Sequence, residues 1–242
     1  PSINEFCITT CTVNGSGSAT ANHILYRTLF HLGIPTSGKN IFPSNIKGLA
    51  TWFVLRVSEK GHTGRQPYDD IIIAMNKDTL EKDMAYLHDG GVVFYADHLS
   101  LPENPCDDLI YYPMPIKSLM KEVDIPRKLH SFMENMLFVG IVAQVLGISL
   151  EALKSTIHGH FSSKPAIADS NFSIVKLGFD YAAENIEKRD RFQVKALAPL
   201  DDYILTDGNN AGGLGSLFGG VQFCSWYPIT PATSLVEAMI DQ

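Results

Sequence analysis

Residues 5–32 read EFCITTCTVNGSGSATANHILYRTLFHL, and this stretch decides the fold class. Its first nine residues are rich in β-branched side chains, which favour an extended strand. The glycines of NGSGS predict a turn, and after it apolar residues recur at the spacing of one helix face: Ala21, Ile24, Leu25, Thr28, Leu29 and Leu32. The order strand, glycine turn, helix is the opening unit of an α/β fold.

Short apolar runs predict further strands downstream. They cover residues 50–58, 69–75, 92–97 and 109–114, with a short helix over 79–88. Continuous apolar strands between helices are typical of a sheet that is covered on both faces, so we predict a three-layer α/β/α domain. The pattern then becomes helical over 116–121, 128–146, 150–161 and 171–188, and Ser149 is placed to cap the third of these helices.

The chain changes character near Asp190, which predicts a domain boundary. The charged run EKRDR gives way to YILTDG, a glycine-rich segment GNNAGGLGSLFGG, and VQFCSW, of which the first and last predict strands. YPITP then opens a final helix near Ala232. We assign residues 1–190 to a first domain and 191–242 to a linker and the incomplete start of a second, because so short a piece cannot bury an α/β core alone.

The composition argues against several classes of protein. The 242 residues are 45% hydrophobic, enough for a packed core, and the formal net charge is −7 without a cluster of Lys and Arg, so no nucleic-acid partner is expected. The chain opens without a signal-like segment, and its most apolar stretch, 136–150, is shorter than the about 20 residues that a bilayer span needs. We expect a cytoplasmic protein without membrane contact.

The metal-binding residue types show no ligand spacing. Cys7 and Cys11 lie close together, but Cys106 and Cys224 are isolated, which matches neither a zinc site nor an iron–sulfur motif. The eight histidines contain no pair at metal spacing with a carboxylate as third ligand, and His158 and His160 would point to different sides of a helix. No metal site is predicted on this chain.

Gly15, Ser16, Gly17 and Ser18 form the first candidate site. Glycines at a strand-to-helix turn let the backbone approach a ligand, while the free amides of the helix start face an anion. A tight turn of this kind needs glycine for steric reasons alone, so both interpretations stay open. A dinucleotide site is disfavoured, because Thr36, Ser37 and Lys39 stand where an acidic residue would hold a ribose.

Two further segments are candidates. YPITP places two prolines around Ile229 and Thr230, which stiffens the backbone just before a helix; it is either a binding turn or a helix cap. Ser44, Asn45 and Lys47 of FPSNIKG either line a cleft or form a hydrated bend.

Taken in order, NGSGSATAN, FPSNIKG leading into TWFVLRVS, DDIIIAMN with GGVVFYAD, and DGNNAGGLGSLFGGVQFCSWYPITP resemble the 2-oxoacid:ferredoxin oxidoreductases. The likeness covers nearly the whole chain. It implies a subunit in which a γ-type domain is fused ahead of an α-type, thiamine-pyrimidine-side domain. The FPSNIKG segment looks most like enzymes acting on 2-oxoglutarate. Such enzymes form succinyl-CoA and CO2 and pass electrons to ferredoxin.

The resemblance also implies site residues, cofactors and partners. Thr230 would position the substrate, Tyr227, Pro228 and Ile229 would line the thiamine side of a shared active site, and the loop Gly15–Ser18 would cradle coenzyme A. Thiamine diphosphate with Mg²⁺ and the [4Fe–4S] cluster would lie mainly on a partner β subunit, in an (αβ)2 assembly. Ferredoxin would be the partner that accepts the electrons. The resemblance implies that the carboxylate that activates the thiamine ring lies further along the α-type domain than residue 242, and no ferredoxin-like cysteine motif is present.

Two alternatives remain beside this assignment. The chain is either an enzyme subunit that is catalytically incomplete alone, or a non-catalytic scaffolding or regulatory module of such a complex. The substrate is 2-oxoglutarate or another 2-oxoacid, such as pyruvate or a branched-chain acid.

Overall fold

The computed structural model describes residues 1–42, 48–123, 125, 130–229 and 232–241. The chain divides into two compact units, Pro1–Leu200 and Asp201–Gln242. Each is described by itself. Phe192 and Val194 are buried in the first unit, which ends at Leu200 and so continues past residue 190, where the expected first domain ends.

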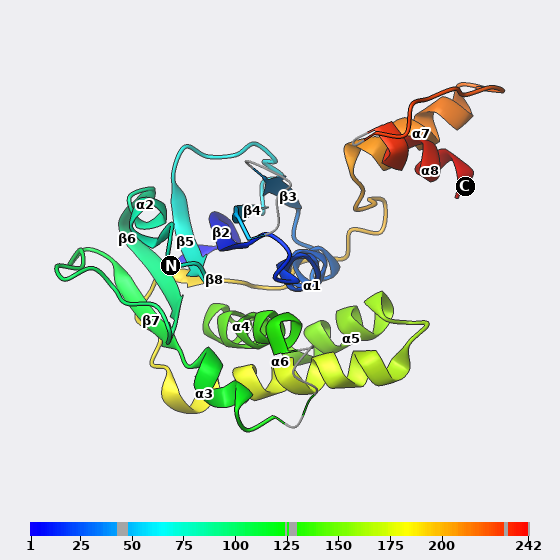
Figure 1. The fold of residues 1–242 in the computed structure, drawn as a ribbon. Helices are drawn as coiled ribbons and strands as arrows, with labels where there is room; N and C mark the ends of the chain where they lie inside the picture. The colour runs from blue at the N-terminus through cyan, green and yellow to red at the C-terminus, as the bar shows by residue number, and fades with distance from the viewer. Residues whose placement is uncertain (43–47, 124, 126–129, 230–231, 242) are drawn as a thin grey trace. The chain divides into compact units, whose positions relative to one another are not determined.

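The first unit is built on a six-stranded sheet with the order β3-β4-β2-β5-β6-β7 (Figure 1). The strands are β2 (Glu5–Val13), β3 (Thr36–Ile41), β4 (Ala50–Ser58), β5 (Asp69–Ala74), β6 (Leu87–Ala96) and β7 (Ile110–Met114). Strands β2, β5, β6 and β7 run parallel, whereas β3 and β4 are antiparallel to their neighbours. The predicted α/β class is confirmed.

The antiparallel β4 occupies the place beside β2 where a second parallel strand would stand in a dinucleotide-binding unit. Its residues Ala50–Ser58 pair with all of β2, from Val13 back to Glu5. The chain leaves α1 (Ser18–His31), forms β3 at the sheet edge and returns through β4. This order does not make the parallel strand-helix-strand unit that holds a dinucleotide.

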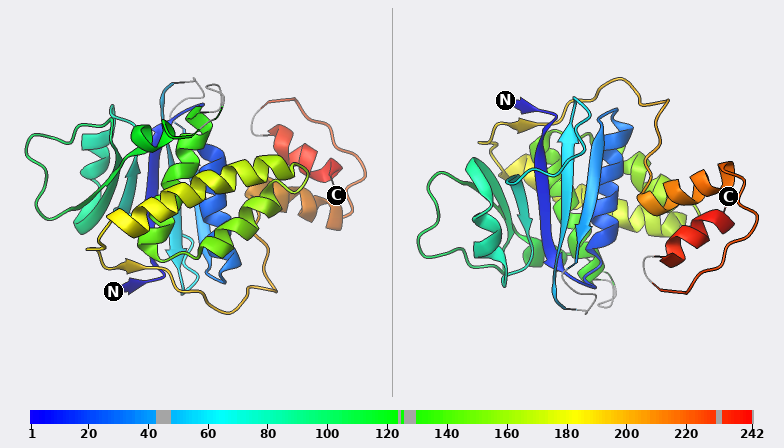
Figure 2. Two further views of the ribbon diagram at one scale, coloured as in Figure 1. Left: turned by 90° about the horizontal axis from the view of Figure 1, so that it is seen from below. Right: turned by 90° about the horizontal axis from the view of Figure 1, so that it is seen from above.

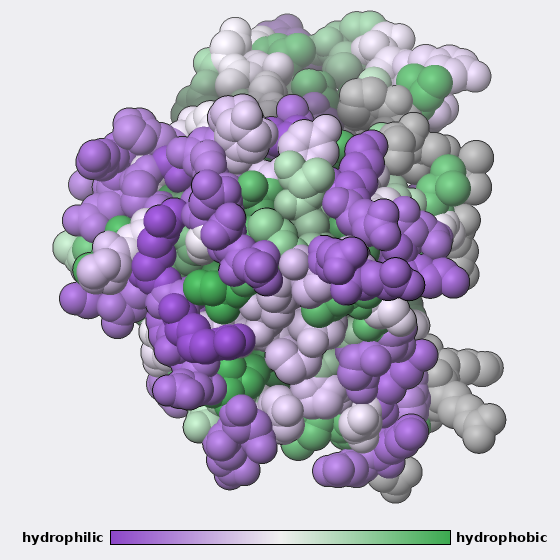
Figure 3. All heavy atoms as spheres, turned by 90° about the vertical axis from the view of Figure 1, so that its left-hand side faces the viewer, coloured by the Kyte–Doolittle hydropathy of each residue, from purple (hydrophilic) through white to green (hydrophobic). Residues whose placement is uncertain are grey.

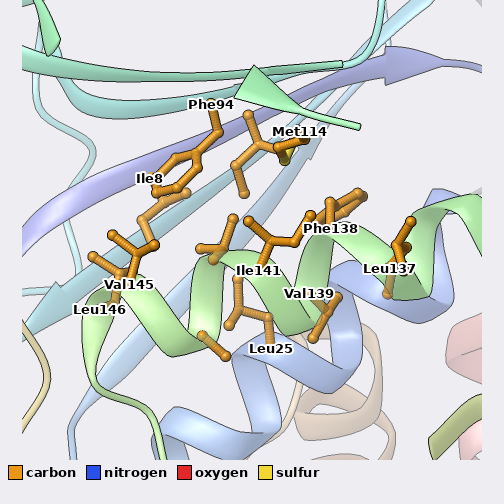
Figure 4. Close-up of a cluster of buried hydrophobic side chains, with 14 of the residues drawn as sticks. Ile8, Leu25, Phe94, Met114, Leu137, Phe138, Val139, Ile141, Val145 and Leu146 are labelled. Carbon is orange, nitrogen blue, oxygen red and sulfur yellow. The ribbon is translucent and has the colours of Figure 1, made fainter. Parts of the chain in front are cut away.

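Four helices cover one face of the sheet: α1, α4 (His130–Leu146), α5 (Leu150–His160) and α6 (Pro165–Asn185) (Figure 2). Helix α4 is apolar on nearly all sides because it lies between the sheet and other helices, and Phe138 and Ile141 point into the shared core (Figure 4). Ser149 caps α5 as predicted, its Oγ accepting a hydrogen bond from the amide of Ala152.

Two glycines set the close approach of α4 and α6. A Cβ atom at Gly140 would lie 2.0 Å from the carbonyl oxygen of Val175, and one at Gly178 would lie 2.3 Å from that of Leu137. Both distances are shorter than any real Cβ contact. The two helix backbones therefore touch where each lacks a side chain.

The opposite face of the sheet carries a thinner layer, formed by the short helix α2 (Leu80–Met84) (Figure 1). Alternation along β4 shows the two faces: Phe53 packs edge-on against Tyr26 of α1, whereas Trp52 Nε1 donates to Asp83 Oδ1 of α2 at 2.8 Å. Hydrophilic side chains dominate the face of the molecule seen in Figure 3. The layer is thin because the expected helix over 79–88 ends at Met84 and β6 begins at Leu87.

The N-terminus is joined to the end of the first unit by a small second sheet. Strand β1 (Ser2–Ile3) pairs in parallel with β8 (Phe192–Gln193), and Phe192 packs edge-on against Phe6. Asn4 is fully buried with a left-handed φ of 51°. Its side chain donates to the carbonyl of Lys195 and accepts from the amide of the same residue, at 2.8 and 2.9 Å.

The second unit contains helices α7 (Gly208–Phe218) and α8 (Ala232–Ile240). The strands expected from YILTDG and VQFCSW are wrong, because no described residue between 201 and 229 forms a strand. An isolated apolar run has no neighbouring strand to satisfy its backbone groups. The glycine-rich segment is helical instead, and Asp207 caps it by accepting from the amide of Asn210 at 2.9 Å.

Many apolar side chains of the second unit are exposed. Phe218, Phe223 and Tyr227 are 85%, 84% and 75% exposed. Exposed apolar surface gathered in one place is characteristic of interaction sites. None of the described helices is both long and apolar enough to cross a membrane.

Candidate functional site

The glycine loop joins the end of β2 to α1 at the edge of the sheet. Gly15 and Gly17 have φ values of 82° and 86°, a left-handed conformation that favours glycine. Gly17 occupies the N-cap position, where no side chain caps α1, and the first turn contains no acidic residue. The first amides of the helix are therefore available to an anion, and the helix dipole adds to the attraction.

A cavity of about 460 Å³ opens beside this loop. Its walls come from the end of β2, the start of α1, strands β3 and β4, and Phe132 of α4. The lining residues are Thr12, Asn14, Gly15, Gly17, Ser18, Ala19, Asn22, Asn40, Phe42, Thr51, Trp52, Phe53 and Phe132. Backbone, amide and aromatic groups line it, and no described lysine or arginine does.

Asn22 is the most informative residue of this cavity. It is 4% exposed, and its Oδ1 atom has no hydrogen-bond partner among the described residues. A buried polar atom without a partner is costly. The cavity wall thus presents a polar group that a ligand can satisfy.

The hydroxyl groups of the loop take different roles. Ser18 Oγ is bonded to Thr12 Oγ1 at 2.9 Å, which ties the helix start to β2. Ser16 Oγ is buried without a partner among the described residues. Thr20 instead lines a neighbouring apolar cavity of about 250 Å³, so it stands away from the first one.

Helix α4 completes the loop from more than a hundred residues away in the sequence. Asn135 Nδ2 donates to the carbonyl of Ser16 at 2.9 Å, and a Cβ atom at Gly17 would lie 2.2 Å from the ring of Phe132. Sequence reasoning missed both residues of α4. Nothing local marks them, because only the packing of α4 brings them to the loop.

The YPITP turn is described only in part. Tyr227, Pro228 and Ile229 are exposed, and the amide of Ile229 donates to the carbonyl of Tyr227 at 2.8 Å. Thr230 lies outside the described residues, as do Ser44, Asn45 and Lys47. The predicted roles of these four residues stay predictions.

The structure groups no described His, Cys, Asp and Glu residues into a potential metal site. Cys7 and Cys11 are buried on β2, and loss of hydration raises the pKa of both thiols, which makes them poor metal ligands and poor nucleophiles. His158 Nε2 lies 3.5 Å from Asp169 Oδ1, whereas the ring centroid of His160 lies 5.6 Å from that of His23 of α1, so these two histidines do face different sides of α5.

A second, smaller cavity of about 150 Å³ lies on the α2 side of the sheet. Asp69 and Asp83 line it together with Trp52 and Lys82. Burial raises the pKa of Asp69. No motif in the sequence marked this cluster, because its members are brought together from β4, β5 and α2.

The family model described as pyruvate ferredoxin/flavodoxin oxidoreductase matches residues 7–181. That range contains the six-stranded sheet except for the first two residues of β2, the glycine loop and most of the helical layer. The chain belongs to this family. The chain spans about 40% of the length of the curated relatives that it matches over most of its own length.

Two curated relatives are named as subunits of oxidoreductases that act on 2-oxoacids. The chain is 23% identical over 266 residues to "2-oxoacid:ferredoxin oxidoreductase 1, subunit alpha" of Sulfurisphaera tokodaii, covering 90% of this chain and 40% of that protein. It is 23% identical over 194 residues to "2-oxoglutarate oxidoreductase subunit KorA" of Mycobacterium tuberculosis, covering 70% and 30%.

Two solved structures share the fold. The 2-oxoglutarate:ferredoxin oxidoreductase of Magnetococcus marinus, solved with 2-oxoglutarate, coenzyme A and succinyl-CoA bound, aligns with a TM-score of 0.85 at 24% identity over 98% of this chain and 41% of its own. The γ subunit of a keto/oxoacid ferredoxin oxidoreductase from Geobacter sulfurreducens aligns with a TM-score of 0.58 at 18% identity, over 74% of this chain and 99% of its own.

Proposed function

We propose that this chain is part of the α subunit of a thiamine diphosphate-dependent 2-oxoacid:ferredoxin oxidoreductase that converts 2-oxoglutarate to succinyl-CoA and CO2. Residues 1–190 are the γ-type domain, and residues 191–242 are the linker and the start of the α-type domain. The observation that carries the proposal is the uncapped glycine loop beside the cavity that holds Asn22. The family match and the named relatives support it.

Coenzyme A is the ligand proposed for the glycine loop. Its phosphate groups suit the free amides at the start of α1, where the backbone and helix dipole replace basic side chains. The unpaired Oδ1 of Asn22 accepts a hydrogen bond from a polar group of the coenzyme. The left-handed Gly15 and Gly17 let the phosphates reach the backbone.

The remaining cofactors are proposed to lie mainly on a partner β subunit, in an (αβ)2 assembly. Thiamine diphosphate, with its Mg²⁺, supplies the electron sink for decarboxylation, and the partner's [4Fe–4S] cluster passes electrons to ferredoxin. The described residues of this chain offer no metal-ligand group and only scattered cysteines, so no step is placed on them.

This chain's own contribution to the shared active site is the YPITP turn. Thr230 positions the 2-oxoacid by a hydrogen bond, and Tyr227, Pro228 and Ile229 line the thiamine side, close to the point where α8 begins. The exposed aromatic surface of the second unit fits a segment that the partner covers. The two prolines of the turn hold its backbone rigid, which lowers the cost of orientation.

The first experiment is an assay of the chain with its native partners. We expect the complex to reduce a low-potential dye only when both 2-oxoglutarate and coenzyme A are present. Thr230→Ala should lower the rate of this reduction, while the circular dichroism spectrum stays unchanged. Activity with pyruvate or 2-oxoisovalerate in place of 2-oxoglutarate would correct the substrate. Unchanged turnover in Thr230→Ala would contradict the role of Thr230.

The glycine loop is tested by calorimetry with coenzyme A. Gly17→Val weakens coenzyme A use, but its side chain also collides with Phe132, so it disturbs the fold as well as the site. Asn22→Leu is the sharper change, because it removes the oxygen that has no described partner and keeps a side chain of the same branched shape. We expect affinity to fall roughly 3- to 10-fold, the value of one hydrogen bond.

Asn185→Leu is the matched control, because Asn185 is an exposed asparagine at the end of α6, away from the cavity lining. It should bind coenzyme A like the unchanged chain. No coenzyme A binding by the chain, with full activity of the complex, would favour the scaffolding or regulatory alternative.

A further inference from the structure

Arg56 lies at the end of the sheet that is remote from the glycine loop. On β4 it stands opposite Cys7, and the strand ends two residues later at Ser58, opposite Glu5. The glycine loop follows Val13, at the other end of the same strand β2. Whatever Arg56 binds is therefore separate from the coenzyme cavity.

The guanidinium group of Arg56 is buried but only partly satisfied. The residue is 4% exposed, and Nη2 donates to Glu5 Oε1. Its Nε and Nη1 atoms have no hydrogen-bond partner among the described residues. Buried guanidinium donors without acceptors are costly, and arginine keeps its charge at any ordinary pH.

The nearby carboxylates do not supply acceptors for the two remaining nitrogens of Arg56. Glu5 is shared, because its Oε2 accepts from Ser58 Oγ at 2.9 Å, and His62 lies 3.8 Å from its Oε1. Asp70 is engaged with the amide of Cys7 through Oδ2 at 2.8 Å, and no ion pair joins it to Arg56 in the described part of the chain.

An open cavity of about 520 Å³ lies over Arg56. Its wall is the loop of six consecutive residues 61–66, GHTGRQ, which contributes a second arginine, Arg65, and the imidazole of His62. The loop is anchored at two points: the amide of His62 donates to Ser58 Oγ at 3.2 Å, and Ser37 Oγ donates to the carbonyl of Thr63 at 2.7 Å. Two arginines thus face one hollow that no described carboxylate lines.

We propose that this cavity is a second binding site, which takes the oxyanion group of a small metabolite, either a phosphate or a carboxylate. Arg56 supplies buried positive charge from below, only part of which Glu5 offsets, and the exposed Arg65 donates hydrogen bonds to the oxygens of the anion. Hydrogen bonds from a charged donor to an oxyanion are the strong class, and a buried charge beside them is weakly screened. The site lies outside the proposed coenzyme cavity and does not depend on it.

The test is a titration of the ¹⁵N-labelled chain followed by NMR. The probes are inorganic phosphate, succinate and, at equal ionic strength, sodium chloride. We expect the Nε–H signal of Arg56, assigned by its loss in Arg56→Lys, to shift and saturate with one or both oxyanions and not with chloride. The backbone amides of Gly61 and Gly64 give a second report that needs no Arg56 variant.

Two matched variants decide whether the site is specific. Arg65→Gln should weaken binding about tenfold or more, the range of a charge-assisted contact. Lys60→Gln removes the same charge from an exposed residue just outside the cavity lining and should change affinity by less than about twofold, as expected for a screened surface charge.

Preference for phosphate or for succinate would identify the ligand class. Two results in the titration would overturn the proposal: Arg56 and loop signals that do not shift, or signals that shift equally with chloride. An equal loss of affinity in Arg65→Gln and Lys60→Gln would overturn it as well.

Discussion

The contact between α4 and α6 gives the sharpest test of the packing. In Gly140→Ala the new Cβ atom would lie 2.0 Å from the carbonyl oxygen of Val175 and 2.8 Å from the amide nitrogen of Phe179. Both neighbours are backbone atoms that cannot rotate away, so the helices must separate. Overpacking of this kind costs about 1–3 kcal/mol, and we take the upper end because the obstacle is backbone.

The same change also favours the helix, since alanine replaces glycine in the interior of α4. That gain is about 1 kcal/mol. The expected net loss in the free energy of unfolding is therefore about 2 kcal/mol, which lowers Tm by roughly 4–8 °C in a unit of this size. Urea denaturation followed by circular dichroism, with thermal melts beside it, measures both quantities.

Gly159→Ala is the matched control. Gly159 lies inside α5, and nothing stands within 4 Å of the position that its Cβ would take. This variant should gain about 0.5–1 kcal/mol from helix propensity alone. If Gly140→Ala were as stable as the unchanged chain while Gly159→Ala behaved as expected, the close helix contact would be refuted.

Three further predictions concern stability and reactivity in the first unit. Asn4→Ala should cost about 2–4 kcal/mol, through its two buried hydrogen bonds and its left-handed backbone, whereas Asn4→Gly should recover the backbone part in urea melts. Burial, with smaller effects from nearby cations, lowers the pKa of His23 and His160, so both favour the neutral form in the folded state. The stability that depends on these neutral imidazoles is fully present above their unfolded pKa of about 6.5 and declines as the pH falls below it. Between pH 7.5 and pH 5.5, His160→Gln should therefore lose less free energy of unfolding than the unchanged chain. An equal loss in both proteins would contradict this. The raised pKa values of Cys7 and Cys11 predict that a thiol reagent modifies the two exposed cysteines rapidly in the native chain and these two only after unfolding; fast labelling of all four would show that β2 is not buried.

Local patterns in the sequence determined most elements of the first unit. The run from Glu5 to Val13 and the helix after it, the apolar strand β5 and the Ser149 cap all depend on interactions between residues close in sequence. Such interactions are readable because side-chain periodicity and capping are local properties. The α/β class and the family followed from the same segments.

Strand order, by contrast, was decided only by the tertiary structure. Nothing in residues 50–58 indicates that β4 inserts antiparallel beside β2, because alternation along one strand does not encode its neighbour. The same limit explains the wrong strands in the second unit. An apolar run becomes a strand only when another strand takes its hydrogen bonds, and the described residues of that unit provide none.

The sequence by itself determined that a glycine turn joins β2 to α1, since local sterics demand glycine at Gly15 and Gly17. Only the tertiary structure decided what surrounds that turn and what stands at the other end of the strand. Phe132 and Asn135 reach the loop because α4 packs on α1. Two nitrogens of Arg56 have no partner among the described residues, because the fold buries the guanidinium beside Glu5, a carboxylate that Ser58 shares. Contacts between distant residues depend on packing in three dimensions, which no local pattern records.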